Sequence, residues 1–183
     1  MINFKVLLAG KVNAGKTTFI RQISDFEPIT VDEMPTDIDE LKQKEGKATT
    51  VGLDYGAIKV DEQLTLHLFG TPGQDRFEFV WEVLAKGSLG VVILVDSTND
   101  NSITDAPQLV KYYQNLKLPI VIGITKLESD KAKPLEYVLE NLAEFSNIII
   151  PFDTLNKEEV KVLLLTLINL AIETTEGNIQ SMQ

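Results

Sequence analysis

The chain has 183 residues, of which 44% are hydrophobic, and its net charge is −10 at pH 7. This length suits one domain with a proper core, and the acidic balance excludes a general affinity for nucleic acid or anionic lipid, since both would repel the surface. The absence of cysteine excludes disulfides, thiolate metal sites and lipidation at cysteine. The start of the chain has no signal-peptide layout, so we expect a cytoplasmic protein without a direct membrane anchor.

Apolar runs of strand length alternate with helically spaced segments, which is typical of a mostly parallel sheet with crossover helices. The first run extends from Phe4 to Ala9, and a helix is predicted from Thr17 to Ile23. From Ser24 to Lys47 the sequence is polar and acidic and has no sustained period. We therefore expect a long mobile loop in that stretch.

A predicted antiparallel hairpin follows this loop. Its strands are Val51 to Val60 and Leu64 to Phe69, and the second strand alternates leucines with other residues. Two nearly continuous apolar runs come next, Leu89 to Val95 and Pro119 to Ile124. Such runs indicate central strands that are covered on both faces.

The remaining elements complete one domain. Helices are predicted from Pro134 to Phe145 and from Lys157 to about Ile172, with a short strand from Asn147 to Ile150 between them. The pattern predicts an α/β fold whose mostly parallel sheet has six strands, the second of them antiparallel. We expect the domain to cover residues 1–173 and the tail, residues 174–183, to fray.

The sequence GKVNAGKT, residues 10–17, fits the pattern GxxxxGK[ST] directly after a strand and before a helix. Such a loop lets backbone N–H groups converge on phosphate oxygens, and the helix N-terminus adds its dipole. Lys16 is predicted to pair with the β and γ phosphates, and the Thr17 hydroxyl to bind Mg²⁺. A chance match is the alternative. The predicted phosphate-binding residues are Gly10, Asn13, Ala14, Gly15, Lys16, Thr17 and Thr18.

The most specific segment is LFGTPGQDRF, residues 68–77, with Trp81 downstream. On this segment and the loop before it, residues 4 to about 172 resemble the Ras/Arf superfamily of small GTPases, most closely the bacterial MglA-like GTPases. The resemblance implies a P-loop NTPase with a small-GTPase-like three-layer sandwich. It also implies that the Gly73 amide senses the γ-phosphate and that Gln74 orients the attacking water. A plain Pro-Gly turn is the alternative.

Position 70 departs from most of this superfamily. Gly70 stands where an aspartate usually touches the Mg²⁺ shell through water, and MglA-like proteins are similar in lacking that aspartate. The sequence TTVGL, residues 49–53, resembles the first switch of Arf-like members. The resemblance implies that Thr50 adds a second hydroxyl to Mg²⁺ and contacts the γ-phosphate. Thr49 is the rival, and a purely structural strand start is the other alternative.

Base recognition is predicted at ITKLE, residues 124–128, where the family pattern reads Asn/Thr-Lys-x-Asp. The Glu128 carboxylate can accept from guanine N1–H and the exocyclic amine, whereas the acceptor N1 of adenine would be repelled. Thr125 and Lys126 complete the motif, and the resemblance places the amide of Thr154 at the guanine carbonyl. The alternative is a solvated strand end, with Glu128 and Asp130 as surface charges.

These features predict a switch that binds Mg·GTP and hydrolyses it slowly, with switch loops at about residues 25–50 and 70–80. The predicted catalytic residues are Gln74, Lys16 and Thr50, and the predicted metal ligands are Thr17 and Thr50. Arg76 is interpreted as an exposed cation at a helix start or as a partner contact, and an arginine finger in cis is the less favoured alternative. Mg²⁺ and GTP or GDP are the expected ligands. The resemblance implies a roadblock-type regulator as activating protein, beside an effector that the sequence does not identify.

Two other functions remain open from the sequence. Gly70 and Val12 suggest a nucleotide-binding scaffold that no longer hydrolyses GTP. An ATP-using phosphotransferase is the second alternative, because P-loops also build kinases. Such enzymes often clamp a second phosphate with several arginines, and this chain has only Arg21 and Arg76.

Overall fold

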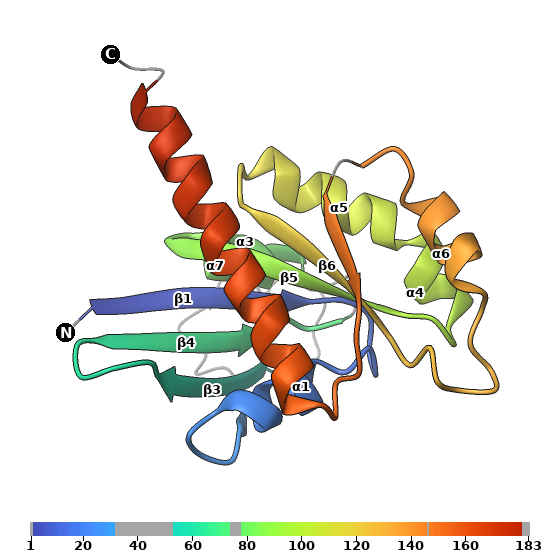
Figure 1. Ribbon diagram of the computed structural model, residues 1–183, viewed down its shortest axis with the longest axis horizontal. Coiled ribbons are helices and arrows are strands. Elements are labelled where there is room, and N and C mark those ends of the chain that lie inside the picture. Colours follow the sequence, from blue (N-terminus) through green and yellow to red (C-terminus); the bar gives the residue numbers. More distant parts are fainter. Residues whose placement is uncertain (1, 32–52, 74–77, 146, 181–183) are drawn as a thin grey trace, which may run out of the picture.

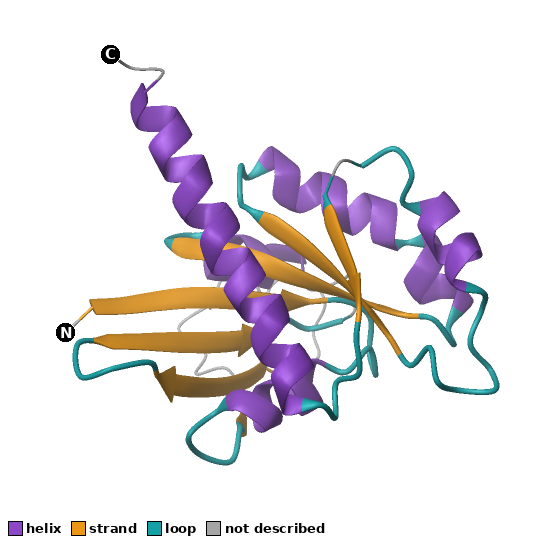
Figure 2. Ribbon diagram, in the orientation of Figure 1, coloured by secondary structure: helices purple, strands orange, loops and turns teal. Residues whose placement is uncertain are grey.

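A computed structural model describes residues 2–31, 53–73, 78–145 and 147–180. In these ranges a seven-stranded sheet of order β2-β3-β4-β1-β5-β6-β7 lies between helices on both faces (Figures 1 and 2). The strands are β1 (Ile2–Ala9), β2 (Ile29–Val31), β3 (Leu53–Lys59), β4 (Leu64–Gly70), β5 (Ser88–Asp96), β6 (Ile120–Thr125) and β7 (Ile148–Pro151). The helices are α1 (Lys16–Ile23), α3 (Glu78–Ala85), α4 (Asp100–Thr104), α5 (Ala106–Asn115), α6 (Leu135–Asn141) and α7 (Lys157–Gln180).

The α/β class, the helices on both faces and the mostly parallel sheet confirm the predicted fold. Strand β3 runs antiparallel to β4, as the hairpin pattern predicts. The sheet has seven strands, however, and the prediction of six was wrong. The added strand β2 lies in the stretch predicted as a loop and pairs with β3, with Thr30 opposite Asp54. Its three residues are all β-branched, but so short a strand leaves no period to detect.

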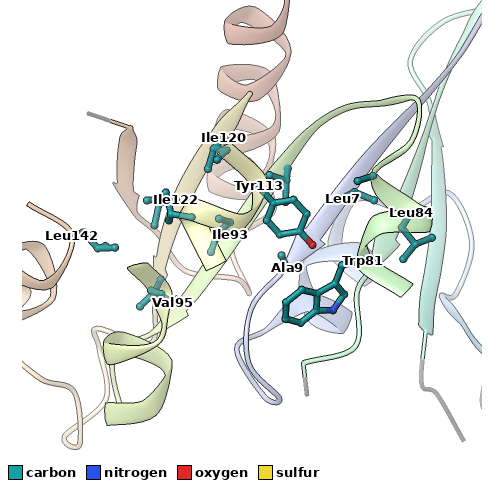
Figure 3. Packing of buried hydrophobic residues seen from close by; sticks show 14 of the residues in the cluster. Leu7, Ala9, Trp81, Leu84, Ile93, Val95, Tyr113, Ile120, Ile122 and Leu142 are labelled. Atoms are coloured by element: carbon teal, nitrogen blue, oxygen red, sulfur yellow. The ribbon is translucent and has the colours of Figure 1, made fainter. Parts of the chain in front are cut away.

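Alternate residues of the central strands face opposite layers of helices. Leu7 of β1 packs in the cluster that contains Tyr113 of α5, and Figure 3 shows both side chains there. Its neighbour Leu8 packs on the other face with Phe19 of α1 and Leu163 of α7. All six residues of β6 are buried. Burial on both faces explains why the central strands have continuous apolar sequences.

Helix α7 is longer than the sequence pattern predicts. It continues to Gln180, although the apolar period ends near Ile172. Among the residues of α7 whose burial is described, which end at position 175, Ala171 is the last buried one and residues 172–175 are exposed; Figure 1 shows this end of α7 extending past the sheet. The apolar period therefore ends beside the first exposed residues, while the helical backbone continues for about two turns. Within the described ranges, none of the helices has the length and hydrophobicity that a membrane-spanning segment requires.

The topology fixes where a ligand site can lie. Strands β1, β5, β6 and β7 are mutually parallel, so the loops that follow them leave the sheet at the same edge. In open α/β sheets, ligands bind in the crevice outside the carboxyl ends of the strands. The predicted phosphate and base motifs follow β1 and β6, and the fold therefore brings them to one edge.

Candidate functional site

The loops after β1, β6 and β7 and the end of β4 enclose one open cleft of about 740 Å³. Its lining comes from segments spread over most of the chain, which only the folded sheet brings together. The lining residues are Val12, Asn13, Gly15, Lys16, Thr17, Thr18, Asp54, Thr71, Pro72, Gly73, Lys126, Glu128, Asp153, Thr154 and Leu155. Gly10 and Ala14, also predicted for this site, lie in the same β1–α1 loop.

The loop after β1 folds around the Lys16 side chain. Its ammonium donates hydrogen bonds to the carbonyls of Gly10 and Lys11, both at 2.8 Å. Burial lowers the pKa of Lys16 to about 8, although the charge of Asp54 acts in the opposite direction. Gly15, with φ of 105°, precedes the first turn of α1 in a left-handed conformation. A cation and the amino end of a helix thus face one cleft, an arrangement suited to a polyphosphate.

The β6 loop is tied to the loop after β1. The Thr125 hydroxyl donates to the carbonyl of Ala14 at 3.2 Å. Lys126, at φ of 62°, donates to the carbonyl of Asn13 at 2.7 Å and to the Asp96 carboxylate at 2.5 Å. These bonds hold Lys126 in an unfavourable backbone conformation beside the phosphate-binding loop.

Asp96 is the last residue of β5 and contacts Lys126 of the cleft, and it is one of two residues around the site that the sequence analysis missed. It is 3% exposed, and burial by itself would raise the pKa of its carboxyl. Hydrogen bonds from Lys126 and Thr98 outweigh burial and hold the pKa below its usual value. The available signal was an aspartate that ends a long apolar run. Because a buried carboxylate requires a partner, such an aspartate indicates a cation nearby.

Two residues predicted for base recognition face the same cleft. Thr154 is 9% exposed and packs against the phosphate-binding loop, where a Cβ on Gly15 would lie 2.9 Å from its Cγ2 atom. Glu128 and Asp130 are both exposed, but Glu128 lines the cleft and Asp130 is not among its lining residues. Of these two carboxylates, Glu128 is therefore the one that lines the cleft.

The end of β4 is held tightly against the loop after β1. The Thr71 amide donates to the carbonyl of Leu8 at 2.8 Å, and the Trp81 indole donates to the carbonyl of Pro72 at 2.8 Å. A Cβ on Gly73 would lie 2.7 Å from the carbonyl carbon of Lys11. Since backbone atoms cannot move aside easily, only glycine fits this position.

Asp54 on β3 is the second residue that the sequence analysis missed. The Thr17 hydroxyl donates a hydrogen bond to its Oδ2 atom, and the Thr30 hydroxyl donates to Oδ1 at 3.0 Å. Asp54 lies directly opposite Gly70 in the β3–β4 register. The only signal in the sequence was an acidic residue within a predicted strand. In the sheet, β4 separates this strand from β1, which precedes the motif that Asp54 contacts.

Some predicted residues lie outside the described residues. They are Thr49, Thr50, Gln74 and Arg76, together with most of the first predicted switch loop. Their roles stay predictions.

Comparison with known proteins also identifies relatives that bear on this cleft. A family model described as "Conserved hypothetical ATP binding protein" matches residues 8–180. An uncharacterised protein of Methanocaldococcus jannaschii is 30% identical over 124 residues, which cover 68% of this chain and 70% of that protein.

More distant relatives include the mouse Ras-related protein Rab-3D, which is 27% identical over 73% of this chain and 58% of its own length. The human EF-hand calcium-binding domain-containing protein 4B is 26% identical over 80% of this chain, but only 19% of that protein is covered. The chain thus spans less than two thirds of both. With its phosphate-binding loop at the edge of a parallel sheet, the chain belongs to the family described as conserved hypothetical ATP binding proteins, a P-loop nucleotide-binding family related to the Ras-like GTPases.

Proposed function

We propose that the protein is an MglA-like molecular switch that binds Mg·GTP and hydrolyses it slowly to GDP and phosphate. The observation that carries the proposal is the shared cleft, in which Lys126 and Glu128 lie with Lys16 and Thr17. A nucleotide with its phosphates on the loop after β1 would direct its base toward Lys126 and Glu128. A carboxylate at that end accepts two donors from guanine and meets an acceptor on adenine.

The phosphate end of the cleft fits a magnesium nucleotide. The Thr17 hydroxyl is a hard oxygen ligand at the start of α1, and Mg²⁺ commonly takes only one or two protein oxygens beside phosphate and water. When bound, the ion neutralises charge that develops on the phosphates. The Lys16 ammonium and the loop amides neutralise the remaining charge at fixed positions.

Hydrolysis is proposed to follow the chemistry that the family resemblance implies. Gln74 would orient a water in line with the γ-phosphorus; the water oxygen bonds to phosphorus as the bond to the β–γ bridging oxygen breaks, GDP leaves, and the water proton passes to the inorganic phosphate formed. Thr50 and the Gly73 amide contact the γ-phosphate, so phosphate release frees both switch loops. A roadblock-type regulator and an effector would read or accelerate this change. A non-hydrolysing scaffold would keep the same binding residues.

Base selectivity provides the test. GDP and ADP compete for the purified protein, and we expect GDP to bind more tightly. Glu128→Gln should reduce the preference for GDP by about 10- to 100-fold, because the variant puts an amide where a charged acceptor stood. The matched control is Asp130→Asn, which removes a neighbouring exposed charge that does not line the cleft. We expect this control to keep the preference.

Adenine nucleotides are the second candidate, because the family description names ATP. Tighter binding of ADP, with no effect of Glu128→Gln, would replace the GTPase proposal by an ATP-binding function. The small number of arginines in the chain speaks against a phosphotransferase that clamps two phosphorylated substrates.

A further inference from the structure

The Thr17 hydroxyl donates a hydrogen bond to the Asp54 carboxylate, and this contact bears on the absence of an aspartate at position 70. A hydroxyl that gives an oxygen lone pair to a cation must send its proton to an acceptor. Thr17 already donates to the Oδ2 atom of Asp54, across the cleft wall. Both residues line the same cleft, so the carboxylate lies beside the position where the hydroxyl would hold a metal.

We infer that Asp54 takes over the role of the missing aspartate and orients the Mg²⁺ shell from the neighbouring strand. The inference rests on the proposed function in one respect, since it assumes that a magnesium nucleotide occupies this cleft. Asp54 does not replace Thr17 as the protein ligand. The Asp54 carboxylate would accept hydrogen bonds from the Thr17 hydroxyl and from a water of the Mg²⁺ shell, as groups around a ligated metal commonly do.

The absence of a side chain at position 70 makes room for this arrangement. A Cβ on Gly70 would lie 3.1 Å from the Cβ of Asp54 and 3.4 Å from its Oδ2 atom. Asp54 and Gly70 are register partners on adjacent strands, so the Asp54 side chain covers the space above Gly70. An aspartate at position 70 would therefore crowd Asp54 and place a second negative charge against it. Most of the superfamily has the carboxylate on the strand that corresponds to β4, whereas this chain has glycine there and carries a carboxylate at the paired position on β3.

The Asp54 carboxylate has the capacity for this role. An ionised carboxylate offers about four lone-pair positions. Thr17 and Thr30 take one on each oxygen in the described residues. The remaining positions can accept from water in the metal shell, and Mg²⁺ usually keeps several waters. The described residues contain no cluster of three or more His, Asp or Glu side chains that could hold a metal ion. A single hydroxyl with a supporting carboxylate is the arrangement that the cleft offers instead.

A purely structural role for Asp54 makes a different prediction. The two threonine bonds tie α1, β2 and β3 together, and their loss would lower stability. Such a loss would weaken nucleotide binding to the same extent with and without Mg²⁺. A role in the metal shell changes only the binding that Mg²⁺ supports.

The experiment measures the dissociation of bound GDP over a range of free Mg²⁺ concentrations for the natural chain and Asp54→Asn. We expect the variant to need about 10- to 100-fold more Mg²⁺ for half-maximal retention. GDP dissociation in excess chelator should stay the same or become slower, because a negative charge near the phosphates is removed. The control is Glu62→Gln, which removes an equal charge at an exposed hairpin position. This control should behave like the natural chain.

A reciprocal exchange completes the test. Asp54→Gly should lose the Mg²⁺ response in the same way, and adding Gly70→Asp to it should restore the response, since the carboxylate then returns to β4. An unchanged Mg²⁺ midpoint in Asp54→Asn would overturn the inference. Equal acceleration of GDP dissociation with and without Mg²⁺ would also overturn it.

The inference and the proposed function fail in different ways. If the natural chain retains ADP and not GDP, the proposal of guanine selectivity is wrong. The Mg²⁺ titration is then made with ADP, because the inferred Mg²⁺ position is at the phosphates and does not depend on the base. If retention of neither nucleotide responds to Mg²⁺ in the natural chain, the inference is overturned together with the metal part of the proposed function.

Discussion

In the proposed function the Lys16 ammonium contacts the phosphates, and its buried environment makes its charge sensitive to pH. In the described structure, burial lowers the pKa of Lys16 to about 8, so the side chain loses its proton as the pH rises through that value. If phosphate oxygens bind beside Lys16 as proposed, they should stabilise the charged form and raise its pKa again in the complex. Nucleotide binding should therefore take up a fraction of a proton that grows as the pH rises through about 8. The affinity for nucleotide should fall over the same pH range.

The measurement is isothermal titration calorimetry with GDP in two buffers of different ionisation enthalpy. The pKa of Lys16 predicts an uptake of about a quarter of a proton at about pH 7.5, and about three quarters at about pH 8.5. The measurement at lower pH serves as the internal control. Uptake that stays constant between the two pH values would show that the Lys16 ammonium keeps its proton in the free protein.

At the scale of elements, the sequence predicts those that are long or strongly periodic. The central strands are recognisable because burial on both faces demands continuous apolar runs, and the phosphate-binding loop is recognisable because its spacing is fixed by a phosphate group. Strand β2 was missed because three residues show no period, and the end of α7 was missed because residues 172–175 are not packed. Periodicity reports packing and not the backbone hydrogen bonds themselves.

In the candidate site, the residues within local motifs were predictable from the sequence, and those that contribute only through tertiary contacts were not. Lys16, Thr17, Lys126 and Glu128 stand in local motifs with fixed spacing, and the structure places all four in one cleft. Asp54 contacts Thr30 on the adjacent strand β2 and Thr17 on α1. Asp96 contacts Lys126 just after the adjacent strand β6. Strand register sets such contacts, and neither residue stands within a motif that would reveal it. A tertiary contact of this kind leaves only the weak signal of a charge in an apolar strand.

Helix α3 anchors the segment that the family resemblance assigns to the second switch. Trp81 on this helix is 6% exposed, its indole donates to the carbonyl of Pro72 at 2.8 Å, and its ring packs edge-on against Tyr112. We expect Trp81→Phe to lower the free energy of unfolding by about 1–3 kcal/mol, because the buried carbonyl of Pro72 loses its donor while the aromatic packing is largely kept. Urea unfolding followed by circular dichroism measures the change.

The matched control on the same helix is Val83→Ala. Val83 is 60% exposed, so this truncation should leave the free energy of unfolding nearly unchanged. Equal urea midpoints for Trp81→Phe and Val83→Ala would contradict the anchoring role of Trp81.

At the scale of the whole molecule, the candidate site and the contact between Leu167 of α7 and the sheet lie at different ends of the strands. The loops that form the cleft follow the carboxyl ends of β1, β6 and β7. Gly90 lies near the amino end of β5, and a Cβ placed there would lie 2.8 Å from Leu167 of α7. This separation allows α7 to contribute to stability through the sheet without touching a ligand in the cleft.

Leu167→Ala tests that separation. Leu167 is fully buried, so its truncation should lower the free energy of unfolding by about 2–5 kcal/mol. Leu165→Ala is the control on the same helix, because Leu165 is 57% exposed and its truncation leaves no cavity. GDP affinity in native buffer should be the same in both variants. Excess Mg·GDP should then restore stability by mass action, by about 2.7 kcal/mol at about 100 times its dissociation constant, to the same extent in each variant. Loss of GDP affinity in a folded Leu167→Ala protein would show instead that the core under α7 sets the geometry of the cleft.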